Sequence, residues 1–377
     1  EQSEAVRQTI SRLQDEIYAL AGHAFNINSP KQLGTVLFEE LGLPAGKKTK
    51  KLGGYSTNVE VLNSLRAEHD IVGKILDYRL WMKLQSTYIE AIDGLIDKET
   101  QRVHTQFNQM VTATGRLSSS EPNLQNIPVR TEEGRTIRRL FEPGEGYDYL
   151  LSADYSQIEL RLLAHLSQDE GFIRAFIRNE DIHARTASEV FGVPLEQVTD
   201  EERRHAKAVN FGIVYGISDF GLARDLGISR KEAAWYIANY FARYPQVKMF
   251  IDRTVKDAHE TGGVVTMFGR RRELPGLKSG NFQQRSLAER MAMNTPIQGS
   301  AADIIKLAMI AVYQRLREAK LKSRILLQVH DELVVEVPEG EAEAATRILK
   351  TAMEGGVTLP FNLSVDIHQG KNWAEAK

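Results

Sequence analysis

Two short apolar runs in this chain, residues 149–154 and 325–331, each end in an aspartate. An ionised carboxylate at the end of a buried strand costs free energy unless a positive charge meets it. Asp154 and Asp331 are far apart in sequence, and Glu332 follows the second. Together they predict one divalent-metal site that is assembled by folding. The alternative is that both aspartates only form turns, where this residue is common.

Four residues spaced by four form the second feature that could do chemistry: Arg203, Lys207, Phe211 and Tyr215. On a helix this spacing places them along one face. Arginine and lysine bind phosphate, and the two aromatic rings offer stacking surfaces for a base. The stripe therefore favours a ligand with a polyphosphate at one end and a flat ring at the other. An amphipathic helix with buried aromatics and solvated cations would show the same pattern.

The sequence also predicts where this helix begins and ends. Thr199 and Glu202 have the spacing of a capping box, and Gly216 stands where a helix commonly ends. We therefore predict a helix that begins just after Thr199 and stops before Gly216.

The two features suit one reaction. Phosphoryl and nucleotidyl transfer commonly uses two metal ions about 4 Å apart, and Mg²⁺ prefers carboxylate oxygens together with substrate phosphate. Asp154 and Asp331 would supply the carboxylates, and Arg203 and Lys207 would neutralise charge on a leaving phosphate. No Walker loop or G-x-G-x-x-G motif occurs, and the chain has no cysteine. No serine–histidine–acid triad is indicated by local sequence either.

The elements that must position these residues alternate between helix and sheet. Residues 1–95 read as a helical lobe, residues 103–116 as a strand, and residues 117–128 as a polar loop. Residues 166–290 are again helical, with breaks at Gly216, Gly227 and Gly262. Two strands, 325–329 and 333–337, enclose residues 330–332 as a tight hairpin. We expect an α+β fold whose sheet is discontinuous in sequence, with the second helical lobe inserted into it.

Two helix starts are predicted in the first lobe. Ser29 followed by Pro30 is typical of an N-cap and a first helical position. Thr57 and Glu60 have capping-box spacing.

Composition sets limits on the class of protein. The 377 residues are 42% hydrophobic and 26% charged, with a net charge of −2, which is ordinary for a globular protein. No run reaches the roughly 18 apolar residues of a membrane span, and the N-terminus lacks a signal-peptide pattern. The absence of cysteine fits a reducing cytoplasm. The first residue is not Met, which suggests a fragment.

Local charge says more about partners than net charge does. Basic clusters occur at residues 47–51, 203–207 and 270–272. Most charge runs are solvated faces, and only the cluster at 203–207 is distinguished by its aromatic continuation.

Several ordered segments resemble motifs of the family A DNA polymerases. Residues 154–161, 203–216 and 328–332 resemble motifs A, B and C of that family, and residues 114–120, 122–128 and 298–303 are also similar to it. The resemblance covers the chain from about residue 10 to its end and concerns the polymerase module. It implies a right-hand architecture, with a partial thumb at 1–96, palm at 97–165 and 292–377, and fingers at 166–291.

The resemblance also implies roles for individual residues. Asp154 and Asp331 would ligate two Mg²⁺ ions, for which Mn²⁺ could substitute, with the Tyr155 carbonyl assisting and Glu332 nearby. Arg203 and Lys207 would hold the triphosphate. The remaining nucleotide contacts would come from Gln157, Glu159, His183, Phe211 and Tyr215. Of these, Glu159 would block a ribose 2′-hydroxyl.

DNA contacts follow by the same resemblance. Residues near the primer end would probe minor-groove acceptors, which look alike for every correct pair. These residues are Arg116, Gln298 and His330, with Gln125, Asn126, Arg290 and Asn294 around them.

The implied function is DNA-templated addition of dNTPs to a primer 3′-hydroxyl with release of pyrophosphate. The implied partners are primer-template DNA and dNTPs, and we expect a monomer without a membrane partner, in the bacterial cytoplasm and associated with the nucleoid. Exonuclease activity is not expected in these residues. One alternative is a single-subunit RNA polymerase, against which Glu159 argues. Another is a DNA-binding fragment with impaired catalysis, because part of the thumb would be missing.

Overall fold

The computed structural model describes residues 2–44, 55–129 and 132–377. Within it the chain forms two compact units, each built from three segments. The first unit comprises Glu1–Gln106, Ser119–Glu142 and Asn372–Ala374, and the second comprises Phe107–Ser118, Pro143–Lys371 and Glu375–Lys377. The lysine-rich cluster at 47–51 lies outside the described residues. No described helix is long and apolar enough to cross a membrane.

The first unit is mainly helical, as the sequence predicts. The long helices α1 and α4 pack against each other, and Ile17 and Ile75 are fully buried. The Ser29 hydroxyl caps α2 with Pro30 at its first position, which confirms that prediction. The helices are α1 (Gln2–Ala21), α2 (Pro30–Gly34), α3 (Val59–Ser64), α4 (Asp70–Leu84), α5 (Glu90–Gly94) and α6 (Glu132–Arg138), with π-helical turns at Thr35–Glu40 and Gln85–Ile89.

The predicted capping box at Thr57 is wrong by one residue. Asn58 is the N-cap of α3, and its side-chain oxygen accepts the Val61 N–H at 2.9 Å. Thr57 is instead buried, and its carbonyl and hydroxyl oxygens both accept hydrogen bonds from Arg79. Asparagine is as good an N-cap as threonine, so a tertiary contact decided which of the two took that position.

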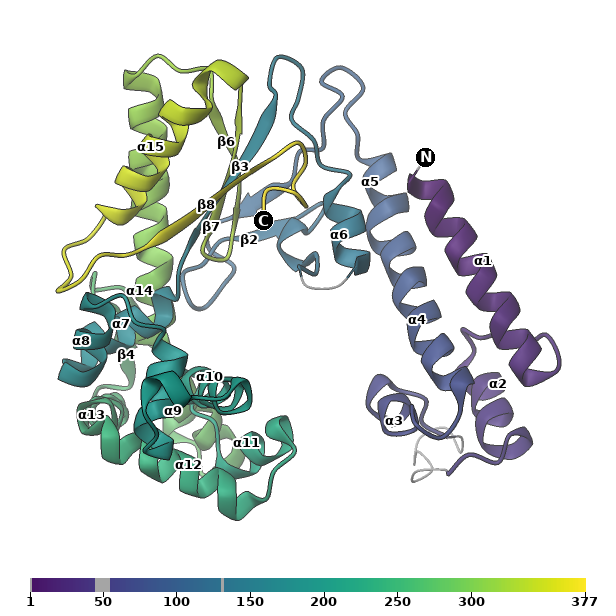
Figure 1. Cartoon of the computed structure of the whole chain (residues 1–377), viewed down its shortest axis with the longest axis horizontal. Coiled ribbons are helices and arrows are strands. Elements are labelled where there is room, and N and C mark those ends of the chain that lie inside the picture. The colour runs from purple at the N-terminus through teal and green to yellow at the C-terminus, as the bar shows by residue number, and fades with distance from the viewer. Residues whose placement is uncertain (1, 45–54, 130–131) are drawn as a thin grey trace. The chain divides into compact units, whose positions relative to one another are not determined.

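The second unit contains a four-stranded antiparallel sheet of order β6-β7-β3-β8. Its central strand β3 (Tyr149–Tyr155) precedes the inserted helices in sequence, and the other three strands follow them, which confirms the predicted discontinuous sheet. These three are β6 (Arg324–Val329), β7 (Glu332–Val337) and β8 (Val365–Gly370). Helices α14 (Phe282–Glu318) and α15 (Ala342–Glu354) contact each other and the sheet, and Figure 1 shows both on one side of it.

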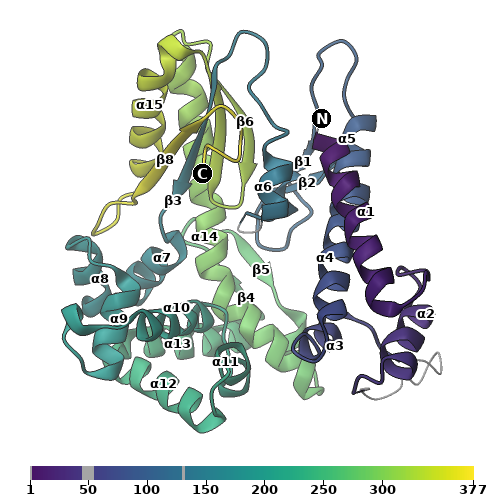
Figure 2. The ribbon, with the colours of Figure 1, turned by 45° about the vertical axis from the view of Figure 1, so that its right-hand side comes forward.

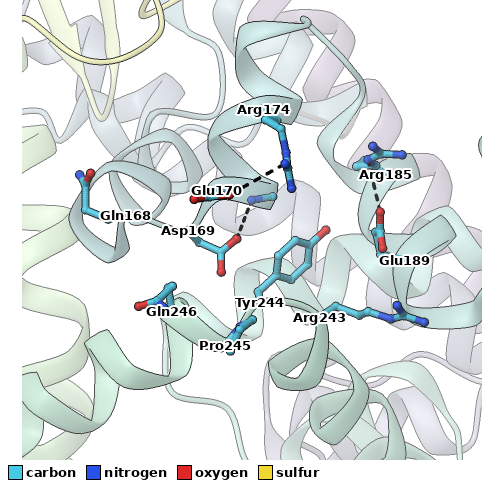
Figure 3. Close-up of a pocket in the computed structure, with 11 residues that line it drawn as sticks. Gln168, Asp169, Glu170, Arg174, Arg185, Glu189, Arg243, Tyr244, Pro245 and Gln246 are labelled. Atoms are coloured by element: carbon cyan, nitrogen blue, oxygen red, sulfur yellow. Dashed lines mark hydrogen bonds and ion pairs between the residues drawn. The ribbon is translucent and has the colours of Figure 1, made fainter.

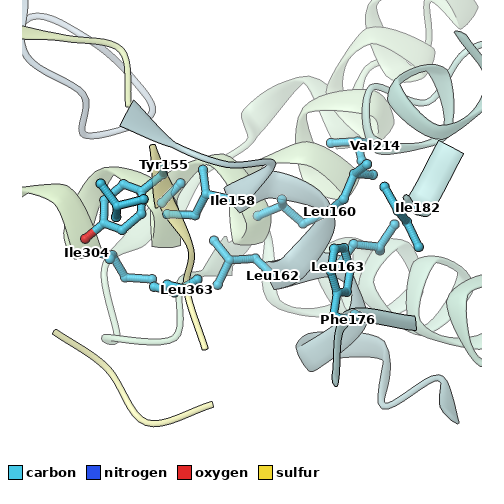
Figure 4. Packing of buried hydrophobic residues seen from close by; sticks show 14 of the residues in the cluster. Tyr155, Ile158, Leu160, Leu162, Leu163, Phe176, Ile182, Val214, Ile304 and Leu363 are labelled. Carbon is cyan, nitrogen blue, oxygen red and sulfur yellow. The ribbon is translucent and has the colours of Figure 1, made fainter. Parts of the chain in front are cut away.

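The core of this unit runs from the sheet into the inserted helices. At the end of β3, Tyr155 leads directly to Ile158 and Leu162, which are buried beside Ile304 and Leu363 (Figure 4). Because the apolar core continues without a break, the carboxyl end of β3 is fixed with respect to the helices that follow it.

The inserted helical region forms a cluster of helices below the sheet in Figure 2. Its breaks lie where the glycines predict them: α10 stops just before Gly216, and Gly227 and Gly262 cap α11 and α13 in left-handed conformations. The elements are α7 (Ile158–Ser167), α8 (Glu170–Ile177), α9 (Ile182–Phe191), α10 (Asp200–Val214), α11 (Asp219–Leu226), α12 (Arg230–Arg243), α13 (Pro245–Thr261) and the hairpin of β4 (Gly263–Val265) and β5 (Arg271–Glu273).

The strand predicted at 103–116 is mostly absent. Only β1 (Gln106–Asn108) is strand, and it pairs with β2 (Ser118–Ser120) inside the segment predicted as loop. Residues 112–116 turn back instead, with Gly115 at φ +83° and the Thr112 hydroxyl donating to the Arg116 carbonyl. The alternation of polar and apolar residues did not reveal a turn closed by a side-chain hydrogen bond.

Candidate active site

The two predicted aspartates meet at one end of the sheet. Asp154 lies in β3, and Asp331 lies in the two-residue turn that joins β6 to β7, where His330 has φ +53°. The backbone N–H of Tyr155 donates to the Asp331 carbonyl at 3.1 Å, which ties the turn to the end of β3. The hairpin predicted around residues 330–332 is confirmed.

Register places a row of carboxylates around Asp154. Glu332 on β7 and Asp366 on β8 are its direct partners across the two neighbouring strands, and directly opposed residues share one face of an antiparallel sheet. Burial, opposed by Lys377 but reinforced by Glu332, Asp331 and Asp366, raises the pKa of Asp154 to about 6. Asp366 was missed by sequence reasoning because it stands in no recognisable motif.

Lys377 is the second residue that sequence reasoning missed. Its ammonium pairs with the buried carboxylate of Glu332 and lies 3.8 Å from an oxygen of Asp154. Glu332 also accepts the Ser152 hydroxyl at 2.8 Å. Nothing in the sequence links a lysine at 377 to an aspartate at 154, since only β8 and the turn after it bring the two together.

The residues present fit a divalent ion that is completed by a substrate. In the described part of the chain no three histidine or acidic side chains converge into a ready-made metal cluster. Mg²⁺ is commonly held by one or two carboxylates plus substrate phosphates, and Asp154 and Asp331 supply two. Burial raises the pKa of Asp331 as well, against the nearby Arg116, so this group of acids is short of positive charge.

Arg116 and Glu159 connect this acidic end to the inserted helices. A single guanidinium nitrogen of Arg116 lies 3.1 Å from a Glu159 oxygen and 3.4 Å from an Asp331 oxygen. The other Glu159 oxygen accepts the Tyr215 hydroxyl at 2.9 Å. Glu159, at 7% exposure, is thus held from two sides.

Helix α10 presents its predicted stripe on an accessible face. Arg203, Lys207 and Phe211 are partly exposed, and Tyr215 follows as the C-cap residue at 46% exposure. The aromatics are therefore not core residues, unlike in the simple amphipathic alternative. The capping box of Thr199 and Glu202 is present in both directions, as predicted.

The cations of the stripe differ in their contacts. Arg203 binds Asp181 through two nitrogens, at 2.7 and 2.9 Å. No partner of Lys207 occurs among the described residues. Asp181 at the same time caps α9 by accepting the His183 and Ala184 N–H groups.

His183 is buried behind the stripe. Its Nδ1 lies 3.1 Å from the amide nitrogen of Asn210, and its ring lies 5.7 Å from that of Phe211, centroid to centroid. Burial, helped by Lys207 and Arg203 and opposed by Asp181, lowers the pKa of His183 to about 4. The ring therefore backs Phe211 as a neutral group.

Three residues predicted to contact DNA are spaced four apart on α14, and all three contact the end of α10 or the residues just after it. The Arg290 side chain packs on Gly216, where an added Cβ would lie 3.1 Å from it. Asn294 donates to the Val214 carbonyl at 3.2 Å, and Gln298 hydrogen-bonds to Tyr215.

The remaining predicted residues fall into two groups. Tyr155 buries its ring and donates its hydroxyl to the Met353 carbonyl, so only its backbone can face the site, and Gln157 takes a left-handed conformation at the start of α7. Gln125 and Asn126 belong to the first unit, in a 3-10 turn.

A polar pocket of about 380 Å³ lies elsewhere in the second unit (Figure 3). Within it Asp169 accepts N–H groups of Gly171 and Phe172 at the start of α8 and that of Gln246 at the start of α13. None of the residues that line this pocket is a predicted site residue.

Comparison with known proteins agrees with this geometry. A family model described as DNA polymerase family A matches residues 1–375. The chain belongs to DNA polymerase family A. Members of this family use divalent metal ions, which agrees with the paired aspartates.

Among family A relatives, DNA polymerase I of Caldicellulosiruptor bescii is 56% identical over 99% of this chain. That of Geobacillus stearothermophilus is 56% identical over 98% of it. The chain spans 43% and 42% of these relatives, which is less than half of their length. The polymerase domain of Pol1 from M. smegmatis, in a complex with DNA primer-template and dNTP, matches with a TM-score of 0.90. It is 46% identical, and the match covers 100% of this chain and 66% of that one.

Proposed function

We propose that this chain catalyses DNA-templated DNA synthesis. The primer 3′-oxygen attacks the α-phosphorus of a dNTP, the bond to the leaving pyrophosphate breaks, and the 3′-hydroxyl proton passes to solvent. The main support is the unbroken set of contacts from the α10 stripe to Asp331: Tyr215 binds Glu159, and Arg116 bridges Glu159 and Asp331. A nucleotide on the stripe would therefore have its sugar end beside the acidic residues.

Each residue has a proposed task. Arg203 and Lys207 bind the triphosphate, whose several charges compete with the single carboxylate of Asp181 for Arg203. Phe211, backed by His183, packs against sugar and base, and Glu159 excludes a 2′-hydroxyl. Tyr215 occupies the position where the templating base arrives. The DNA contacts are Arg116, Arg290, Asn294, Gln298 and His330, with Gln125 and Asn126 from the first unit.

Asp154 and Asp331, with the Tyr155 carbonyl, would hold two Mg²⁺ ions, and Mn²⁺ could replace them. When bound, such ions lower the pKa of the attacking hydroxyl and offset charge on the transferred phosphate. Glu332 lies opposite Asp154 on the neighbouring strand, and the Lys377 ammonium lies 3.8 Å from an Asp154 oxygen.

We further propose residues 1–96 as thumb, 97–165 and 292–377 as palm, and 166–291 as fingers. The partners are primer-template DNA and dNTPs, and the active form is a monomer. We place it in the bacterial cytoplasm, in association with the nucleoid.

Primer extension on a defined template tests this function. We expect extension with dNTPs and Mg²⁺, little with NTPs, and none without metal. Asp154→Ala and Asp331→Ala should each abolish extension while the dissociation constant for primer-template DNA stays nearly unchanged. Extension with NTPs as efficient as with dNTPs, or near-normal activity of either aspartate variant, would refute the assignment.

A further inference from the structure

An ion pair between a half-exposed arginine and a buried aspartate lies next to the proposed site, and it joins two sequence features that the reaction leaves unexplained. These are Asp303, from the segment 298–303, and Arg270, from the basic cluster 270–272. One Asp303 oxygen accepts hydrogen bonds from two nitrogens of Arg270, at 2.7 and 2.8 Å. The other oxygen accepts a hydrogen bond from the Thr266 hydroxyl at 2.8 Å. Because the Asp303 side chain is only 7% exposed, removing Arg270 would leave a buried charge uncompensated.

The Arg270 side chain also lies against the loop that carries Arg116. A Cβ added to Gly115 would lie 2.9 Å from Nε of Arg270 and 3.0 Å from its Cδ. Gly115 has φ +83°, so the loop needs glycine there both for its conformation and for this contact.

The same loop also lies close to Gly299 of α14. A Cβ added to Gly299 would lie 2.6 Å from the Thr266 methyl group and 3.5 Å from the Thr114 carbonyl oxygen. Asp303, Arg270, Thr266 and Gly299 thus form a support for residues 112–116.

Arg116 itself has few anchors beyond this loop. In the described structure its side-chain hydrogen bonds, to Glu159 and Asp331, both come from one terminal nitrogen, and its buried Nε has no hydrogen-bond partner there. The direction of its guanidinium is therefore set largely by the backbone from which it projects.

We propose that the Asp303–Arg270 ion pair is a positioning device for Arg116. It holds residues 112–116 against α14, so that Arg116 bridges Glu159 and Asp331 in the geometry that the reaction needs. Asp303 and Arg270 contact neither nucleotide nor metal and act through Arg116. This inference rests on the proposed polymerase function.

The competing explanation is that Arg270 binds a DNA phosphate directly, as one member of a basic cluster. Arg271, its neighbour on the same hairpin, is the matched control. It pairs with Glu273 at 2.6 Å and donates to the Thr261 carbonyl, and in the described structure none of its hydrogen bonds or ion pairs reaches residues 112–116. If the cluster acts through phosphate contacts, then Arg271→Gln should weaken DNA binding as much as Arg270→Gln.

The test is a double-mutant cycle on single-nucleotide incorporation with the full chain. We expect Arg270→Gln and Asp303→Asn each to lower kcat/KM for dNTP by roughly tenfold to hundredfold. The loss should lie mainly in kcat, with the Kd for DNA within about twofold of wild type. Combined with Arg116→Ala, neither should lower kcat/KM further, because the group through which they act is already gone. Arg271→Gln should stay within about twofold of wild type throughout.

Three results would overturn the inference: losses that multiply with that of Arg116→Ala, an equal loss for Arg271→Gln, or a loss confined to DNA affinity. Should Arg270→Gln fail to fold, Arg270→Lys replaces it in the same double-mutant cycle, since lysine keeps the charge but offers one donor group. The same loss of kcat/KM is expected, again without a further loss when it is combined with Arg116→Ala. A wild-type chain that extends no primer would refute the proposed function instead.

Discussion

At the scale of single residues, Glu159 has two separable tasks. Its oxygens hold Tyr215 on one side and Arg116 on the other, and its bulk is proposed to block a ribose 2′-hydroxyl. A change that removes the bulk should therefore differ from one that removes only the charge.

We predict that Glu159→Ala increases use of ribonucleotides. The discrimination between dATP and ATP, measured as the ratio of kcat/KM values, should fall by roughly tenfold or more. Efficiency with dATP should also fall, because Tyr215 and Arg116 both lose their acceptor. Glu159→Gln, which has nearly the same size, should keep most of the discrimination. Unchanged discrimination in the alanine variant would show that another group excludes the 2′-hydroxyl.

At the scale of elements, α10 depends on its first turn. The Thr199 hydroxyl accepts the Glu202 N–H, and the Glu202 carboxylate accepts the Thr199 N–H at 2.8 Å. We predict that Thr199→Ala lowers the free energy of unfolding by about 1 kcal/mol and raises KM for dNTP, because Arg203 stands one residue beyond this turn. Urea denaturation and steady-state kinetics measure the two effects. Ser229→Ala, at the cap of α12, is the control and should lower stability without raising KM.

The junction of α9 and α10 should make stability depend on pH. His183 has a folded-state pKa of about 4, below the 6.5 of an unfolded histidine. Between these values the unfolded chain binds a proton that the folded chain does not, so stability falls as pH drops from 6.5 towards 4, by at most about 3 kcal/mol.

His183→Gln should flatten this part of the curve in urea denaturation from pH 7.5 to 4.5. The matched control is His259→Gln, because His259 is exposed and pairs with Glu289 at 2.9 Å. An unchanged slope in the His183 variant would contradict the assignment.

Elements with strong local signals were predictable from the sequence. The strand ending at Asp154, the hairpin at Asp331 and the limits of α10 follow from apolar runs, caps and glycines, and the structure has them there. Asp366 and Lys377 were not predictable, because they reach Asp154 only through strand pairing and chain return. The turn at residues 112–116 was missed for a related reason, since packing on α14 and Arg270 outweighs local alternation.

At the scale of the whole molecule, the last residues of the chain serve both units. Asn372–Ala374 belongs to the first unit, and Glu375–Lys377 belongs to the second. Within the first unit, one residue of this C-terminal segment belongs to the core. That residue is Trp373, which is fully buried.

Trp373 should be a main determinant of the first unit's stability despite its place near the end of the sequence. The Arg138 guanidinium lies 4.0 Å from the centre of the Trp373 ring, and the Phe141 ring packs edge-on at 5.7 Å. The backbone N–H of Trp373 donates to the Phe141 carbonyl. We predict that Trp373→Ala lowers the free energy of unfolding by about 3–5 kcal/mol, with faster hydrogen exchange concentrated in α6. Trp235→Ala, at a ring that is 48% exposed on α12, should cost about 1 kcal/mol or less. Equal losses for the two variants would mean that the C-terminal segment merely lies on the first unit. The predicted difference would instead make the segment Asn372–Ala374 part of that unit's core.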